Sequence, residues 1–129
     1  MSATSSADIP QFEINSGPGP EDVYVVRVAG EVDMSHEEEL RHELRTAVAA
    51  DSKGIVVDLT ECEFIDSTGI ALIVRTWQRL DRGAGGEGEG RLVLCSHNHQ
   101  VRRLLKITGV ESSISMHDQR TAALAELRG

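Results

Sequence analysis

Short apolar runs alternate with segments of helical periodicity along most of the chain. Runs rich in β-branched and apolar residues predict strands. Five such strands are expected, at Gln11–Ile14, Val23–Ala29, Ile55–Leu59, Arg91–Cys95 and Ser113–Met116. The run Ile55–Leu59 is apolar at successive positions, as in a central strand that is buried on both faces.

Apolar residues spaced by three and four positions predict a helix after each of the last four strands. The first of these helices is expected from about His36 to Ala50. Ser35 and Glu38 form a capping-box pattern at its start, and Glu37 and Arg41 are spaced for an ion pair on its exposed face.

The second helix follows Ile55–Leu59 and is expected to end near Leu80. Asn98 is a suitable N-cap for the third helix, and Gly109 is suited to end that helix. Asp118 is a suitable N-cap for the fourth helix. The apolar stripe of the second helix consists of Ile70, Ile73, Val74 and Trp77.

The predicted order of elements is therefore β-β-α-β-α-β-α-β-α. Alternation of this kind predicts an α/β fold, with a mixed sheet of four to five strands and about four crossover helices. We expect one domain over residues 9–129, preceded by a disordered tail at residues 1–8. The glycine-rich segment Gly83–Gly90 is expected to be a flexible loop.

Composition narrows the possible functions. The chain of 129 residues carries a net charge of −8, which argues against nucleic acid or an anionic membrane as a partner. The N-terminus lacks the basic and apolar regions of a signal peptide, and the longest aliphatic run, Ile70–Val74, is too short to span a bilayer. A cytoplasmic location is therefore expected, with Cys62 and Cys95 as buried free thiols.

Candidate chemistry lies where the strand Ile55–Leu59 leads into the second helix. The tetrad Asp66-Ser67-Thr68-Gly69 contains good N-cap residues and a glycine without side-chain bulk. A helix N-terminus presents free N–H groups and favours anions, so a phosphorylated hydroxyl would be tolerated there. The tetrad predicts that Ser67 is a modification switch; a simple N-cap is the structural alternative. A nucleophilic serine is disfavoured, because no G-x-S-x-G motif surrounds it.

A metal site and a cofactor site are not expected. Cys95, His97 and His99 are three possible ligands, but on the end of a strand their side chains would alternate in direction. We interpret them as one buried thiol and two loop histidines. A short basic face on the third helix indicates either a solvated surface or contact with an acidic partner, and it consists of Arg102, Arg103 and Lys106.

Three segments in order carry a resemblance to a known family. The segment F-I-D-S-T-G-I contains the tetrad, G-E-V-D precedes it by about thirty residues, and L-V-L-C-S followed by V-R-R-L-L-K-I-T-G-V comes after it. Together they resemble bacterial anti-sigma factor antagonists of the STAS domain family over roughly Phe12–Leu127. The resemblance implies a single STAS-like domain.

It also implies a regulatory protein without catalysis. Unphosphorylated members bind an anti-sigma factor, usually a serine kinase of the GHKL type, and thereby release a sigma factor. The kinase phosphorylates the serine at the position of Ser67, and a serine phosphatase reverses the change. The free protein is expected to be a monomer. The remaining alternative is a STAS module that senses a nucleotide or another small ligand without phosphorylation.

The partner is expected to bind around Ser67, on the exposed side of its helix and on the loop Gly30–Ser35. Leu72 motivates this surface, because it falls off the apolar stripe of the helix. The expected partner contacts are Asp33, Asp66, Thr68, Gly69 and Leu72. The alternatives are that Asp66 only caps the helix and that Asp33 only ends its strand.

Overall fold

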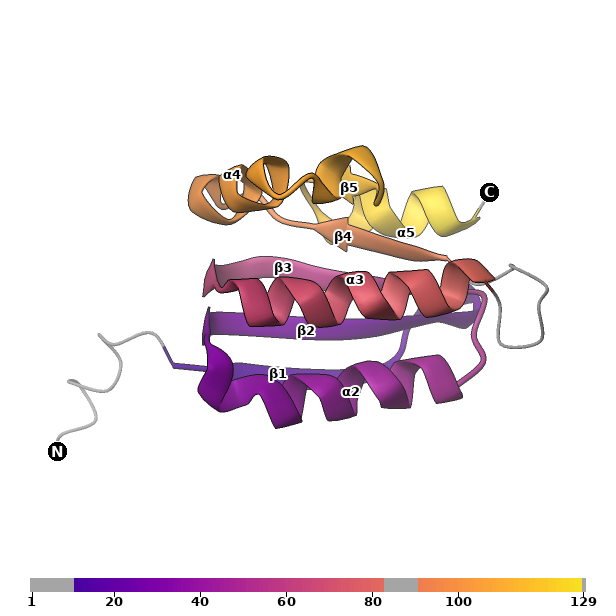
Figure 1. Cartoon of the computed structure of the whole chain (residues 1–129). Coiled ribbons are helices and arrows are strands. Elements are labelled where there is room, and N and C mark those ends of the chain that lie inside the picture. The colour runs from indigo at the N-terminus through magenta and orange to yellow at the C-terminus, as the bar shows by residue number, and fades with distance from the viewer. Residues whose placement is uncertain (1–10, 83–90, 129) are drawn as a thin grey trace, which may run out of the picture.

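A five-stranded sheet forms the centre of the protein, for which a computed structural model describes residues 11–82 and 91–128 (Figure 1). The strand order follows the sequence, and β1 is antiparallel to β2 while the other neighbours are parallel. The strands are β1 (Glu13–Pro18), β2 (Val23–Val32), β3 (Gly54–Ile65), β4 (Leu92–Cys95) and β5 (Met116–His117).

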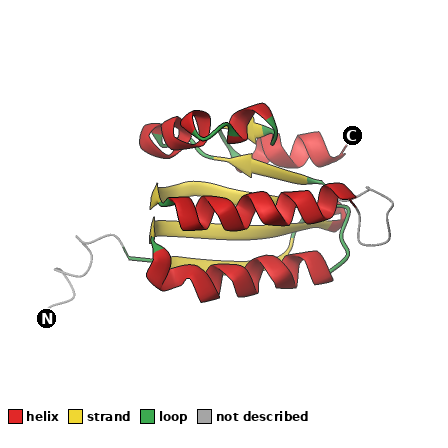
Figure 2. Ribbon diagram, in the orientation of Figure 1, coloured by secondary structure: helices red, strands yellow, loops and turns green. Residues whose placement is uncertain are grey.

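Helices cover both faces of the sheet (Figure 2). They are α2 (Glu37–Ala49), α3 (Ser67–Arg82), α4 (His99–Ile107) and α5 (Arg120–Arg128), with short 3-10 turns at Pro20–Asp22, Met34–His36 and Val110–Ser112. α2 and α3 lie side by side along the strands on one face, and α5 packs on the other (Figure 1). The predicted α/β class, mixed sheet and order of elements are confirmed.

Strand β3 divides the core into two parts because its side chains alternate between the two faces. Ile55 and Val57 pack with the helices α2, α3 and α4, whereas Val56 packs beneath α5. All three are fully buried. This confirms the expectation of a central strand buried on both faces.

Several boundaries differ from the prediction. The turn-rich segment Asn15–Pro18 belongs to β1, because it pairs with β2 from Asn15 opposite Arg27 to Pro18 opposite Tyr24. Strand pairing thus overrides the local preference of this segment for turns. β3 continues six residues beyond the expected Leu59, and the last strand lies at Met116–His117 instead of Ser113–Met116.

The predicted helix ends were right in part. Asn98 caps α4 by accepting a hydrogen bond from the Val101 N–H at 3.0 Å, as expected. The Glu37–Arg41 ion pair is also present. Asp118 does not directly precede α5, which begins at Arg120; its carboxylate instead accepts a hydrogen bond from Arg102.

Both cysteines are free and buried, as predicted. Burial raises the pKa of the Cys62 thiol to about 11 and that of Cys95 to about 12. Neither thiol is therefore a nucleophile at neutral pH. The tail at residues 1–8 and the loop Gly83–Gly90 lie outside the described residues. Among the helices that the structure describes, none is long and apolar enough to cross a membrane.

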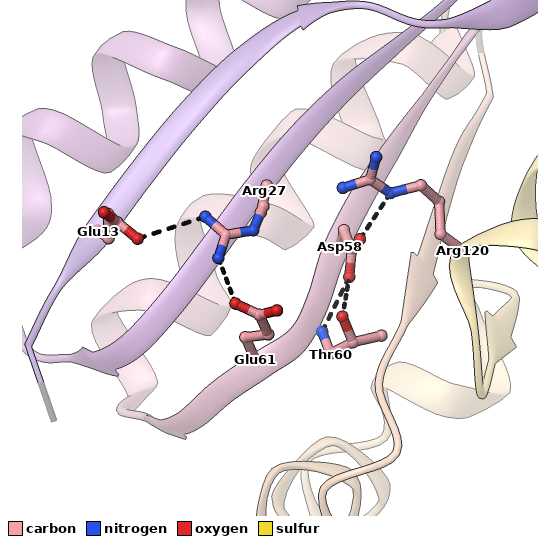
Figure 3. Close-up of polar contacts among 6 residues, drawn as sticks. All are labelled: Glu13, Arg27, Asp58, Thr60, Glu61 and Arg120. Carbon is pink, nitrogen blue, oxygen red and sulfur yellow. Dashed lines mark hydrogen bonds and ion pairs between the residues drawn. The ribbon is translucent and has the colours of Figure 1, made fainter.

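One buried carboxylate anchors α5 to the sheet (Figure 3). Asp58 of β3 is only 4% exposed, and its carboxylate accepts hydrogen bonds from the Thr60 N–H at 2.9 Å and from the Arg120 Nε at 2.7 Å. Burial acts to raise the pKa of Asp58, but the hydrogen bonds from Thr60 and Arg120 outweigh it and lower the pKa below its ordinary value.

A second charged cluster lies on the same sheet face beside the first (Figure 3). Arg27 of β2 pairs with Glu61 of β3 and, at 3.5 Å, with Glu13 of β1. These three strands therefore carry a network of ion pairs on the face opposite α2 and α3.

We expect Arg120→Gln to lower the free energy of unfolding by about 1–3 kcal/mol at neutral pH, because it leaves the buried Asp58 carboxylate without its cationic partner. The pKa of Asp58 is lowered by folding, so its contribution is present above the unfolded-state pKa and is lost as the pH falls through the folded-state pKa. The deficit of the variant should therefore shrink below about pH 4. Urea unfolding at a series of pH values measures it.

Arg103→Gln is the control, because Arg103 is exposed on α4. Its effect should stay within about 0.5 kcal/mol. An Arg120→Gln deficit that is equal at neutral and acid pH would show that the contact with Asp58 is not its cause.

Candidate functional site

Ser67 stands at the junction of β3 and α3, where a single residue, Asp66, separates the strand from the helix. The Asp66 carboxylate accepts a hydrogen bond from the Gly69 N–H at 3.1 Å, and its carbonyl oxygen accepts one from Ile70 at 3.1 Å. This is the geometry of an N-cap residue. Asp66, and not Ser67, therefore caps α3.

The Ser67 side chain is exposed on the first residue of α3. Among the contacts of the described residues, no hydrogen bond engages its hydroxyl. The first N–H groups of a helix have no partners within it, and they add the positive end of the helix dipole. Among the described residues, the site thus presents a hydroxyl without a hydrogen-bond partner, beside the positive end of a helix dipole.

Gly69 allows α3 to pack closely on the ends of β2 and β3. A Cβ atom at Gly69 would lie 2.8 Å from Cγ1 of Ile65 and 3.3 Å from Cγ1 of Val32. The first of these distances is a clash between buried groups, so the glycine has a structural role in positioning the helix. It is buried and offers little surface to a partner.

The G-E-V-D segment lies beside the same junction. Val32 accepts a hydrogen bond from the Asp66 N–H at 3.1 Å, which places the loop after β2 next to the start of α3. Gly30 has a φ of +84°, and a Cβ there would lie 1.6 Å from the Gln11 carbonyl oxygen. Only glycine can meet both demands.

Asp33 organises the loop that follows. Its carboxylate accepts hydrogen bonds from the Ser35 N–H at 3.0 Å and from the Ser35 hydroxyl at 2.6 Å, and these bonds lower the pKa of Asp33. It caps the 3-10 turn Met34–His36, with the His36 side chain in the reciprocal position. The predicted capping box of Ser35 and Glu38 was wrong, because this turn comes before α2.

The expectation that Leu72 lies off the buried stripe was also wrong. Its side chain is only 6% exposed and packs in the main core. The reason is that α3 contacts α2 as well as the sheet, so its buried face is wider than a single stripe. Leu72 is consequently not available as an exposed contact.

Two exposed apolar side chains near Ser67 were missed. Met34 is 70% exposed in the loop after β2, and Phe64 is 45% exposed at the end of β3. Phe64 also lines an apolar groove of about 260 Å³ that runs to Ile107 of α4. The sequence did carry a signal for this region, because the apolar residues Cys62, Phe64 and Ile65 follow Leu59 closely and could have indicated that the strand continues to Ile65.

The residues at the end of β4 do not converge on a metal. Cys95 is buried, whereas His97 and His99 are both exposed. Within residues 11–82 and 91–128, no group of three or more His, Cys, Asp or Glu side chains is placed to hold a metal ion. The arrangement around Ser67 therefore offers a modifiable hydroxyl and a mixed polar and apolar surface.

Comparisons with known proteins agree with this fold. A family model described as the STAS domain matches residues 17–123. Among curated relatives, the anti-sigma F factor antagonist of Paenibacillus polymyxa is 29% identical over 106 residues, which cover 81% of this chain and 86% of the relative.

Solved structures show the same architecture. An anti-sigma factor antagonist from Mycobacterium paratuberculosis has a TM-score of 0.82 at 24% identity, over 92% of this chain and 96% of the other. The Bacillus cell fate determinant SpoIIAA in its phosphorylated form has a TM-score of 0.65 at 21% identity, over 91% of this chain and 99% of the other. At these identities the structures establish a shared fold.

Substitutions can separate the capping role from any role of the hydroxyl. Asp66→Ala should lower the free energy of unfolding by about 1 kcal/mol, because it removes the N-cap of α3. Ser67→Ala should change it by less than about 0.5 kcal/mol, because the exposed hydroxyl holds no structural hydrogen bond. Chemical denaturation of the two variants is the measurement. A larger loss for Ser67→Ala than for Asp66→Ala would make Ser67 the cap after all.

Proposed function

The chain belongs to the STAS domain family, and we therefore propose that it is an anti-sigma factor antagonist that phosphorylation of Ser67 switches off. In its unphosphorylated form it binds an anti-sigma factor and so releases a sigma factor. Its role is regulatory binding without catalysis. The observation that carries the proposal is the exposed, unengaged Ser67 hydroxyl at the start of a helix that Asp66 caps.

The division of labour between Asp66 and Ser67 supports a switch. A residue that capped the helix could not be modified without weakening the fold, because its side chain would be engaged with backbone N–H groups. The Ser67 side chain does not cap the helix. A phosphate on Ser67 would add a charge of about −1.5 to −2, and the N-terminus of α3 would offset part of it. The domain should therefore stay folded in both states.

The same phosphate would disrupt a complex. Glu61 and Glu63 are exposed near the end of β3, and Asp66 adjoins Ser67, so the new charge joins an acidic neighbourhood. Like charges brought together in an interface cost on the order of several kcal/mol. To change the ratio of bound to free protein from about 99:1 to 1:99, phosphorylation must weaken binding by roughly 5.5 kcal/mol. One phosphate at the centre of the interface is sufficient for that.

The contact surface consists of the loop after β2 and the start of α3. Asp33 holds the loop and Thr68 adjoins the phosphoacceptor, while Gly69 sets the position of the helix. Met34 and Phe64 are proposed as the apolar contacts instead of Leu72, because Met34 is exposed in the loop after β2 and Phe64 is exposed three residues before the serine. A partner that covered these side chains would bury apolar surface around one central hydroxyl.

The partner we propose is a serine kinase of the GHKL type that acts as the anti-sigma factor, opposed by a serine phosphatase. Sigma factors act on RNA polymerase in the bacterial cytoplasm, so the proposal places the protein there. In the free state the protein is a monomer of one STAS domain over residues 9–129.

The proposal can be tested by incubating the purified protein with the GHKL-type anti-sigma factors of its own cell. With ATP, one of them should transfer a single phosphate to Ser67, and Ser67→Ala should abolish the transfer. Thr68→Ala is the control and should still accept the phosphate. With ADP, the unphosphorylated protein should bind that kinase at least 100-fold more tightly than the phosphorylated protein, equal to about 2.7 kcal/mol. Equal affinities of the two forms would refute the switch.

Phe64→Glu should weaken binding of the same kinase at least tenfold, because it places a charge within the proposed apolar contact. Ala125→Glu is the matched control, since Ala125 is exposed on α5 at the opposite face of the sheet. Titration calorimetry measures both variants. If Phe64→Glu binds like the parent, the surface around Phe64 is not part of the interface.

A further inference from the structure

Four arginines line a groove between α2 and α3. Its volume is about 300 Å³. Arg41 and Arg45 come from α2, and Arg75 and Arg79 come from α3; the remaining lining residues are Leu44, Val48, Leu72 and Thr76. The two helices lie side by side on the same face of the sheet (Figure 1), so the arginines form two facing rows.

This arrangement is unfavourable in the absence of a counter-charge. Within each row the two arginines are four residues apart, and like charges at this spacing destabilise a helix. Facing the two rows across one groove adds further repulsion. The chain has 21 acidic and 13 basic residues, so its composition does not force arginines to gather at one place.

Among the side chains that the structure describes, carboxylates neutralise only one of the four. Arg41 pairs with Glu37, and with Glu38 at 3.7 Å. For Arg45, Arg75 and Arg79, no carboxylate among the described side chains lies within ion-pair distance. Each of these three is exposed at the groove. Three guanidinium groups are therefore available to an anion.

We propose that the groove between α2 and α3 binds a small phosphate-bearing ligand, held by Arg45, Arg75 and Arg79. Guanidinium groups bind phosphate oxygens through paired hydrogen bonds, and three of them match the multiple oxygens of one phosphate. Val48, which is half-buried, provides an apolar contact for the less polar part of the ligand. The Thr76 hydroxyl does not contribute a donor, because it donates to the Leu72 carbonyl oxygen at 2.8 Å.

Size and charge favour a small molecule over a polyanion. A groove of about 300 Å³ lies at the lower end of the range for small-ligand sites. A nucleic acid would extend beyond the groove and be repelled by a protein of net charge −8. A compact ligand interacts mainly with charges within about 8 Å, so it is affected chiefly by the arginines of the groove.

The groove is separate from the proposed phosphoacceptor. From Ser67 to Arg75 the helix rises about 12 Å, at roughly 1.5 Å per residue. Ligand binding at the groove is therefore independent of the proposed phosphorylation of Ser67. An experiment can refute one of these two proposals without refuting the other.

The test measures thermal stability and binding heats with inorganic phosphate, ribose 5-phosphate and ATP, each against sodium chloride of equal ionic strength. At least one phosphate compound should raise the melting temperature more than chloride does. Arg75→Gln and Arg79→Gln should each weaken its binding at least tenfold. The control Arg103→Gln removes an exposed arginine of α4 that does not line the groove, and it should bind like the parent.

The probes distinguish the sources of the phosphate. Equal affinity for all three would indicate a site for the phosphate group alone, whereas tighter binding of ATP or of ribose 5-phosphate would assign the groove to that class of compound. Without ligand, the double variant of Arg75→Gln and Arg79→Gln should be at least as stable as the parent, because it removes like-charge repulsion. Ser67→Ala should bind the phosphate compound normally.

Two results would overturn the proposal. One is that none of the three phosphate compounds raises the melting temperature more than sodium chloride of equal ionic strength does. The other is a folded double variant that binds the phosphate compound as tightly as the parent does.

Discussion

The direct connection of α3 to the buried strand β3 determines the position of Ser67, the candidate functional residue of this protein. β3 lies between two parallel neighbours and packs against helices on both faces, so its position is held by the whole core. Asp66 alone separates it from α3, and Gly69 lets the first turn of the helix contact Ile65 and Val32. The exposed serine at the start of the helix is therefore held on a rigid base, so the proposed phosphorylation would change the surface around it without changing the fold.

The sequence predicted the class of fold and the place of the candidate site, because both depend on local patterns. Apolar runs and helical spacing gave the order of elements, and the Asp66-to-Gly69 tetrad located the junction of β3 and α3. The predictions that were wrong concerned residues whose environment depends on contacts with segments distant in the chain. Pairing with β2 extended β1 into a segment of turn residues, and packing against α2 drew Leu72 into the core. The exposed side chains of Met34 and Phe64 could be identified only once the neighbours of each residue were known.

The helix α3 connects two surfaces of opposite character. Its first turn adjoins carboxylates and exposed apolar side chains, which suits a protein partner and makes an added phosphate repulsive. Its later turns carry Arg75 and Arg79 toward α2, which suits a bound anion. Because both surfaces rest on one well-packed helix, the two proposed activities can coexist in one small domain.

The central claim is that Ser67 is phosphorylated in the cell and that its occupancy changes with conditions. Phosphosite mapping by mass spectrometry, on protein purified from growing and from stressed native cells, tests this most directly. The account predicts a single phosphate on Ser67 whose occupancy differs between the two. Protein that carries no phosphate at Ser67 under either condition would contradict it.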